Sequence, residues 1–476
     1  MNLENIKKYS YYLVVGLILL FGFLIRLKLL LDNPSFWFDE SCLGFNVLSL
    51  NYAEFFKPLH LQQIAPPLFL VMSKLNIDIF GASDMNLRLF PFIIGNLAML
   101  MFLLVLKQNF KNKLTIILGL FFLCFNVQAM KYSVEFKPYI VEMFSTCLVL
   151  YVFTKLNWNY SYKKLALIGF GLALVPWFAF ISAVMISIAF LLKFSKEFYK
   201  KWIVFISPFL ISSGLLIFYY LKIKNFYNEF MVDFFTDSFF NFHDFLIQFS
   251  VVINSLFQMK LVLFPIILLL LAIIYCLIKK EHKFLLKFSC LVMLSGVILS
   301  FLQIYLFYGR FVVFILPLVL LLITSLFNGM IEHKKFYTLI PTVVVLIFFM
   351  IPMVFIACNI VKEPFNKESC ARELFIEMAE KQKVDDVIII DTLSLPDFLY
   401  YNGYYNLKNR LYWNGLQKGK TILYKMDKDE QIPLEREHNN WLFATWPSTD
   451  YSYLTPDYEQ GCKYNSGLIM YFKKDK

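Results

Sequence analysis

Residues 11–41 read YYLVVGLILLFGFLIRLKLLLDNPSFWFDES, a long apolar run followed by a short aromatic and polar segment. The apolar part is long enough to cross a bilayer core of roughly 30 Å at about 1.5 Å per residue. Two adjacent carboxylates, Asp39 and Glu40, therefore lie where a membrane helix reaches the surface. Such a pair can serve as a base or a metal ligand. It can equally begin a helix, because acidic side chains are favoured in a first turn.

The composition is that of a membrane protein. The 476 residues are 59% hydrophobic and include 55 Phe, whereas soluble domains rarely exceed about half apolar residues. Apolar runs of about twenty residues recur along the chain, which predicts a multi-pass protein of the cell membrane. The net charge of +11 indicates basic cytoplasmic loops and anionic lipid or phosphate partners rather than nucleic acid.

The charged flanks of the apolar runs predict an orientation. Lys7 and Lys8 precede the first run, which fits an uncleaved signal anchor with a cytoplasmic amino end. Assigning basic loops to the cytoplasm gives about eleven spans and an extracytoplasmic carboxyl end. At the outer end of the first run, Arg26 is expected to snorkel to the interface, the alternative being a phosphate contact.

Three segments depart from simple spans. Residues 66–80 are too short to cross and are expected to lie as an interfacial helix in the first external loop. Residues 165–192 have basic flanks on both sides, so we expect a hairpin of two helices bent at Pro176. Residues 222–256 carry several acids and His243, which predicts a second external loop.

The predicted fold is mainly α: a transmembrane domain, residues 1–361, and a small extracytoplasmic α/β domain, residues 362–476. In the second domain charged residues and Tyr return and apolar runs shorten. Helical spacing covers residues 371–383, and strand patterns cover 384–391 and 441–445.

The eight cysteines show no CxxC or metal-finger spacing. Five of them lie in apolar runs, where packing is the expected role. Cys370 and Cys462 fall in the C-terminal domain and can form a disulfide if that domain is extracytoplasmic.

The predicted topology places four ionisable clusters on the outer side, which suggests one site assembled from separate loops. Each has a plainer interpretation. Glu135 and Lys137 can form an interfacial ion pair, Arg310 can snorkel, and His243 can be a solvated loop residue. The fourth cluster is Asp39 with Glu40.

Five short motifs occur in order along the membrane part: WFDE at 37–40, APPL at 65–68, GASDMNLRL at 81–89, YSVEFKPY at 132–139 and GRFVVFILP at 309–317. Together they resemble motifs of the GT-C superfamily of integral-membrane glycosyltransferases, in particular its protein O-mannosyltransferase and aminoarabinose-transferase-like group. The chain departs from that pattern at three positions. Ala65 stands in place of a histidine, Lys137 in place of an arginine, and Phe311 in place of a tyrosine.

The resemblance implies transfer of a sugar from a polyprenyl-phosphate carrier to an acceptor protein, lipid or glycan outside the cytoplasm. It implies catalytic roles for Asp39, as general base, and for Glu135. The phosphate-binding candidates are Arg88, Lys131, Lys137, Tyr139 and Arg310. If a divalent metal ion takes part, Glu40 and His243 are its candidate ligands. A single base acting against a phosphate leaving group indicates inversion at the sugar.

The alternative is a transporter or lipid flippase. That function calls for charges at the centres of spans and for paired broken helices in two halves of the chain. The sequence shows one proline-broken hairpin without a matching partner, which favours the transferase. A scaffold without catalytic activity is a third hypothesis, raised by Ala65.

Overall fold

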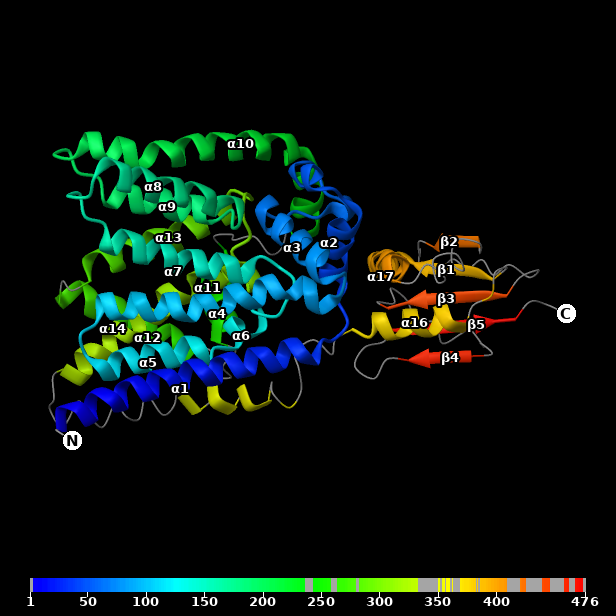
Figure 1. Ribbon diagram of the computed structural model, residues 1–476, viewed down its shortest axis with the longest axis horizontal. Helices are drawn as coiled ribbons and strands as arrows, with labels where there is room; N and C mark the ends of the chain where they lie inside the picture. Colours follow the sequence, from blue (N-terminus) through cyan, green and yellow to red (C-terminus); the bar gives the residue numbers. More distant parts are fainter. Residues whose placement is uncertain are drawn as a thin grey trace. The chain divides into compact units, whose positions relative to one another are not determined.

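The computed structural model describes residues 3–235, 243–257, 263–279, 282–332, 350–351, 353–355, 357–359, 362, 369–381, 383, 386–408, 420–424, 439–445, 458–461 and 467–473. The chain folds into two compact units (Figure 1). The first comprises Met1–Lys28, Ala65–Phe69 and Pro91–Val361, and the second comprises Leu29–Ile64, Leu70–Phe90 and Lys362–Lys476. Residues 33–83 join the first two long helices, and we call them the first connection. Most of this connection thus packs with the C-terminal residues.

The first unit is helical. Its elements are α1 (Leu3–Asp32), α4 (Asp84–Asn109), α5 (Lys113–Cys124), α6 (Val127–Lys131), α7 (Tyr139–Lys155), α8 (Tyr162–Leu174), η3 (Val175–Trp177), α9 (Ser182–Leu192), α10 (Tyr199–Phe235), α11 (Phe245–Phe257), α12 (Leu263–Lys279), α13 (Lys283–Phe301), η5 (Gly309–Ile315) and α14 (Leu316–Glu332). The ends of α1 and α4 nearest the first connection belong to the second unit. Most of these helices run alongside one another in Figure 1.

Within the described residues, five helices are long and apolar enough to cross a membrane, and four shorter apolar helices accompany them. The five are Tyr9–Asp32, Asp84–Asn109, Tyr199–Lys224, Lys283–Phe301 and Gly309–Glu332. The prediction of a multi-pass membrane protein is therefore confirmed. The total of about eleven spans stays a prediction, and the last expected span, residues 337–360, lies largely outside the described residues.

The core of this unit lies at α14. The apolar window that includes α14 is 89% buried, whereas that of α10 is 28% buried, so α14 is enclosed by protein and α10 has an exposed apolar side. A polar contact links α14 to α5, because the Thr115 hydroxyl donates to Asn328 Oδ1 at 2.9 Å. In an apolar interior such a bond fixes the register of two helices.

Two of the sequence interpretations can be compared with these helices. The break at Pro176 is confirmed: α8 ends at Leu174, and α9 begins at Ser182. The second external loop at 222–256 stays a prediction, and the structure shows that the segment contains helices. Helix α10 continues through Lys222 to Phe235, and α11 begins at Phe245, so most of this segment is helical. Charged residues end an apolar run without ending a helix.

The second unit combines the first connection with the C-terminal module, by which we mean the described residues from 369 onward. The connection contains α2 (Phe38–Ser49), η1 (Tyr52–Phe56), η2 (His60–Gln62) and α3 (Pro67–Phe80). The predicted helix at 66–80 is thus present. The C-terminal module contains α16 (Ala371–Lys381), β1 (Val387–Asp391), η6 (Thr392–Ser394), α17 (Leu395–Lys408), β2 (Lys420–Tyr424), β3 (Asn440–Ala444), β4 (Tyr458–Gly461) and β5 (Leu468–Phe472).

The five strands of the C-terminal module form one sheet in the order β2-β1-β3-β5-β4. Strand β1 is parallel to β2 and β3, and Ile389 is paired with Ile422 on one side and Leu442 on the other. All residues of β1 are buried, as expected for a parallel strand covered on both faces. The predicted small α/β fold is confirmed, with its helix at 371 and its strands near 387 and 441.

Cys370, which precedes α16, is disulfide-bonded. Cys462, the partner suggested by the sequence, lies outside the described residues. A disulfide in this position fits an oxidising compartment.

Candidate active site

Asp39 and Glu40 lie in the first turn of α2, after an N-cap at Trp37. The interpretation of Asp39 and Glu40 as the start of a helix is therefore confirmed. The two side chains have different surroundings, because consecutive residues of a helix point in different directions. Glu40 is completely buried, whereas Asp39 is half-buried. Of the two residues, Asp39 is therefore the less buried.

Glu40 is paired with Arg88 of α4. Arg88 Nε donates to Oε1 at 2.9 Å, and Nη2 donates to Oε2 at 2.5 Å. The remaining terminal nitrogen of Arg88 donates to the Pro34 carbonyl at 2.7 Å, and the guanidinium lies 4.7 Å from the centroid of the Phe36 ring. This bidentate pair ties the first turn of α2 to the first turns of α4.

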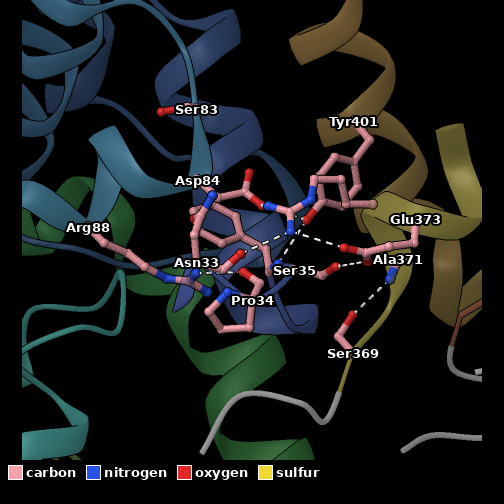
Figure 2. Close-up of polar contacts among 12 residues, drawn as sticks. Asn33, Pro34, Ser35, Ser83, Asp84, Arg88, Ser369, Ala371, Glu373 and Tyr401 are labelled. Carbon is pink, nitrogen blue, oxygen red and sulfur yellow. Dashed lines mark hydrogen bonds and ion pairs between the residues drawn. The ribbon is translucent and has the colours of Figure 1, made fainter. Parts of the chain in front are cut away.

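Asp84, one helical turn before Arg88, carries a second buried carboxyl group (Figure 2). It accepts hydrogen bonds from the hydroxyls of Tyr400 and Tyr401, at 2.8 and 3.0 Å, and from Arg372 Nη1 at 3.1 Å. All three donors come from the C-terminal module. These residues were not predicted from the sequence, since nothing local marks them as partners of Asp84. The one local signal was that Asp84 and Arg88, four residues apart, lie on the same face of a helix, which suggests that the two side chains belong to one polar cluster.

Two pKa shifts follow from this arrangement. Burial raises the pKa of Tyr401 well above its ordinary value, and the nearby charge of Asp84 adds to that effect. Burial alone would lower the pKa of Arg372, but Asp84, Tyr401 and Glu373 outweigh it, and the pKa rises. At physiological pH Tyr401 is therefore a neutral donor and Arg372 a fixed cation.

In the first unit, Glu135 and Lys137 lie in the segment 132–138, which joins α6 to α7. Both are buried, and the Lys137 amide donates to the Glu135 carbonyl at 2.7 Å in a tight turn. Arg26 of α1 holds this segment, because its Nε donates to Ser133 Oγ at 3.1 Å. Arg26 also donates to the Cys124 carbonyl at 3.0 Å. It is completely buried, so the snorkelling interpretation is wrong.

Tyr139 and Arg310 lie close together, although their positions in the sequence differ by 171 (310 − 139). The Arg310 guanidinium lies 5.9 Å from the centroid of the Tyr139 ring and 5.5 Å from that of Phe311. The Tyr139 and Phe311 rings meet edge to face at 5.6 Å. Such contacts orient a cation without neutralising its charge.

Lys131 adds a second cation to this aromatic group. Its ammonium lies 5.9 Å from the centroid of the Tyr132 ring, which in turn meets Tyr139 edge to face at 5.2 Å. Three of the predicted phosphate-binding residues, Lys131, Tyr139 and Arg310, are therefore connected through rings.

The segment that carries Arg310 is supported by α7. The Tyr305 hydroxyl lies 3.0 Å from the Phe311 carbonyl and 3.1 Å from Oε2 of the buried Glu142. The Thr146 hydroxyl, one turn further along α7, donates to the Phe314 carbonyl at 2.7 Å. Glu142 and Tyr305 were not predicted as site residues, because they lie in apolar segments that the sequence predicts to be spans.

His243, the other candidate metal ligand, is exposed between α10 and α11 and belongs to the first unit, whereas Glu40 belongs to the second. Among the residues that the structure describes, no three His, Cys, Asp or Glu side chains form a group that could hold a metal ion. The metal dependence of the protein stays a prediction.

No protein-family model and no curated protein matches the chain at a significant level. Solved structures do match it. ArnT from Cupriavidus metallidurans bound to undecaprenyl phosphate has a TM-score of 0.57 at 9% identity, covering 97% of this chain and 98% of that one. In the apo state ArnT gives a TM-score of 0.58 at 8% identity, with 98% of each chain covered.

The archaeal oligosaccharyltransferase AglB from Archaeoglobus fulgidus also matches, with a TM-score of 0.49 at 12% identity, over 88% of this chain and 69% of that one. At the identities of the two ArnT matches, a likeness describes the fold. The match with ArnT over nearly the whole chain confirms the GT-C fold that the five sequence motifs predicted.

Proposed function

We propose that this protein is a glycosyltransferase that moves a sugar from a polyprenyl-phosphate carrier to an acceptor on the extracytoplasmic side of the membrane. The observation that carries the proposal is the likeness to ArnT, whose structure was solved with undecaprenyl phosphate bound, over 97% of the present chain. A likeness of this extent includes both the membrane helices and the small C-terminal sheet. Shared fold alone does not fix a function, so the residues must supply the chemistry.

Asp39 is our candidate for the general base. The residue is half-buried at the start of a helix, next to a buried ion pair that holds the helix in place. A base needs hydrogen-bond reach to the acceptor hydroxyl before its pKa matters. In the proposed step Asp39 takes the hydroxyl proton, and the acceptor oxygen forms a bond to the anomeric carbon. The bond from that carbon to the phosphate oxygen breaks on the opposite face, which inverts the sugar. We assign Glu135 the supporting catalytic role.

The leaving group is a lipid phosphate, whose oxygen gains negative charge as the bond breaks. Cations placed in advance stabilise such charge at low reorganisation cost. Arg310, Lys131 and Lys137 are our candidates, with Tyr139 as the ring that orients Arg310. Arg88 is engaged with Glu40, so in this proposal it positions Asp39 rather than binding phosphate.

A divalent ion is not needed for this scheme, and Glu40 fits poorly as its ligand. Both carboxylate oxygens of Glu40 already accept hydrogen bonds from Arg88. We therefore derive no step through a metal ion.

The orientation follows from the charged flanks of the spans, with a cytoplasmic amino end and an extracytoplasmic C-terminal module. The disulfide at Cys370 supports this side for the module. A reporter fused after the last residue tests it. Export-dependent reporter activity is expected, and a cytoplasmic signal would overturn the topology.

The donor is identified by incubating the purified protein with a panel of radiolabelled polyprenyl-phosphate sugars and extracytoplasmic acceptor fractions. We expect one donor class to release polyprenyl phosphate and to label an acceptor in equal amounts. Release without labelling would indicate hydrolysis, and no release from any donor would contradict the proposed function.

A further inference from the structure

We propose that the C-terminal module positions Asp39, and that Arg372 and Tyr401 are its positioning residues. The catalytic part of this inference rests on the proposed function. Neither residue is assigned contact with a substrate. Both act on the short turn 33–36, which lies in the connection 33–37 between α1 and α2 and ends three residues before Asp39.

Side chains from the C-terminal module hold three points of this turn (Figure 2). Arg372 Nη2 donates to the Asn33 carbonyl at 2.9 Å. The Ser35 hydroxyl donates to the Glu373 carboxylate, and the Phe36 amide donates to the Tyr401 hydroxyl at 2.8 Å. The Phe36 ring also stacks on Tyr400, with 4.8 Å between the ring centroids.

The turn needs this support because it has no regular backbone pairing of its own. Asn33 adopts a φ of 39°, a left-handed conformation that asparagine tolerates better than most residues other than glycine. Buried backbone groups must find partners elsewhere. Here the partners are side chains more than 300 residues away in sequence, as the separations of 365 and 339 residues for Phe36 and Asn33 show.

One buried carboxylate orients both positioning residues. Asp84 accepts a hydrogen bond from Tyr401, which leaves the Tyr401 oxygen free to accept from the Phe36 amide. Asp84 also accepts from Arg372 Nη1, which directs Nη2 of the same guanidinium toward the Asn33 carbonyl. A planar guanidinium fixes the directions of both donors together. Lysine at this position offers a single nitrogen and cannot reproduce the arrangement.

The fourth point of the turn is held from the membrane helix. Arg88 donates to the Pro34 carbonyl and binds Glu40. The turn is therefore held between α4 on one side and α16 with α17 on the other. Loosening the C-terminal contacts would free the start of α2, and a displacement of about 1 Å at a catalytic group can cost on the order of a hundredfold in rate.

The test uses the full-length protein with Arg372→Met, Arg372→Lys and Tyr401→Phe, and with Lys381→Met as the matched control. Lys381 lies on the same helix as Arg372, in an exposed pair with Glu377. Hydrogen exchange of the segment 33–41 is measured by mass spectrometry, together with kcat and the KM for the donor found above.

We expect exchange in 33–41 to rise at least about tenfold in Arg372→Met and Tyr401→Phe, with kcat lower by about tenfold and the donor KM changed less than about twofold. Arg372→Lys should recover part of both effects, and Lys381→Met should match the wild type. Tyr401→Phe removes a single oxygen, so it serves as the readout if Arg372→Met fails to fold.

Unchanged exchange in both variants would overturn the positioning role. Increased exchange with unchanged kcat would also overturn it, since the turn would then be held for stability alone. If the wild type transfers no sugar, the proposed function fails, and the exchange data still decide whether the module holds the turn.

Discussion

Arg88 forms a bidentate, buried ion pair with Glu40, while Asp39, the preceding residue, is half-buried. The pair separates the roles of two adjacent acids. Glu40 anchors the start of α2 through this pair, whereas Asp39 is the residue that we propose as general base. Because both oxygens of Glu40 are used by one guanidinium, the first turn of α2 has a single favourable orientation.

Removing Arg88 should be costly. Arg88→Met leaves the Glu40 charge buried without its partner, which we expect to lower the free energy of unfolding by about 3–5 kcal/mol. The double variant Arg88→Met with Glu40→Leu should recover part of this loss, because no charge is then left buried. Denaturant unfolding in detergent provides the measurement.

The exposed pair of Lys381 and Glu377, 2.7 Å apart, gives the control. Lys381→Met should cost less than about 0.5 kcal/mol, as is usual for exposed helical pairs. If Arg88→Met and Lys381→Met lowered the free energy of unfolding equally, Arg88 would not have the anchoring role described here.

Gly95 of α4 allows close approach of the segment 132–138. A Cβ at this position would lie 2.2 Å from Ser133 Oγ and 2.6 Å from Ser133 Cβ. We expect Gly95→Ala to destabilise the protein by about 1–3 kcal/mol through overpacking. Gly171 in α8 has open space around it, and Gly171→Ala should be neutral or stabilising by up to about 1 kcal/mol. Thermal unfolding of both variants checks this contrast, and a stable Gly95→Ala protein would refute the packing.

The raised pKa of Tyr401 leads us to expect a loss of stability at alkaline pH. Its pKa is raised in the folded state by burial, followed by the charge of Asp84, so the folded protein keeps a proton that the unfolded chain loses near pH 10. This contribution is complete below about pH 10 and falls as the pH rises toward the folded pKa, by at most about 1.4 kcal/mol per pH unit.

Tyr401→Phe should therefore show a shallower decline of unfolding temperature above about pH 10 than the wild type. Tyr9→Phe, which alters an exposed tyrosine, is the matched control. Parallel declines in wild type and Tyr401→Phe would show that the hydroxyl is not held as described.

Tyr305 supports the segment that carries Arg310 through the Phe311 carbonyl. Tyr305→Phe should raise the donor KM by about three- to tenfold, the equivalent of one lost hydrogen bond. The exposed Tyr308 provides the control variant, Tyr308→Phe, with a KM near that of the wild type. An unchanged KM in Tyr305→Phe would remove the support for Arg310 as a donor-binding cation.

Structural features that depend on neighbouring residues in the sequence were predictable. The apolar runs predicted membrane helices, Pro176 predicted the break between α8 and α9, and the buried strand pattern predicted β1. The motif around Asp39 predicted both the helix start and the GT-C fold. Each of these signals lies within a few residues of the feature it describes.

Contacts between distant residues were not predictable in the same way. The sequence does not show that Tyr401 meets Asp84, because each residue taken alone fits an exposed loop or helix end. Arg26 looked like an interface residue by its place in the run, yet packing with Ser133 encloses it. The continuation of α10 could have been found, since no proline or glycine follows Gly214 before Phe235.

The measurement that tests the account most directly is the rate of sugar transfer by Asp39→Asn with the donor identified from the panel. Asp78→Asn, at an exposed carboxylate that accepts a hydrogen bond from Tyr52, is the matched control. We predict that Asp39→Asn folds as the wild type does and loses at least about a hundredfold in kcat, as expected for removal of a general base. The control should keep its activity. Transfer by a folded Asp39→Asn protein at the wild-type rate would contradict the account.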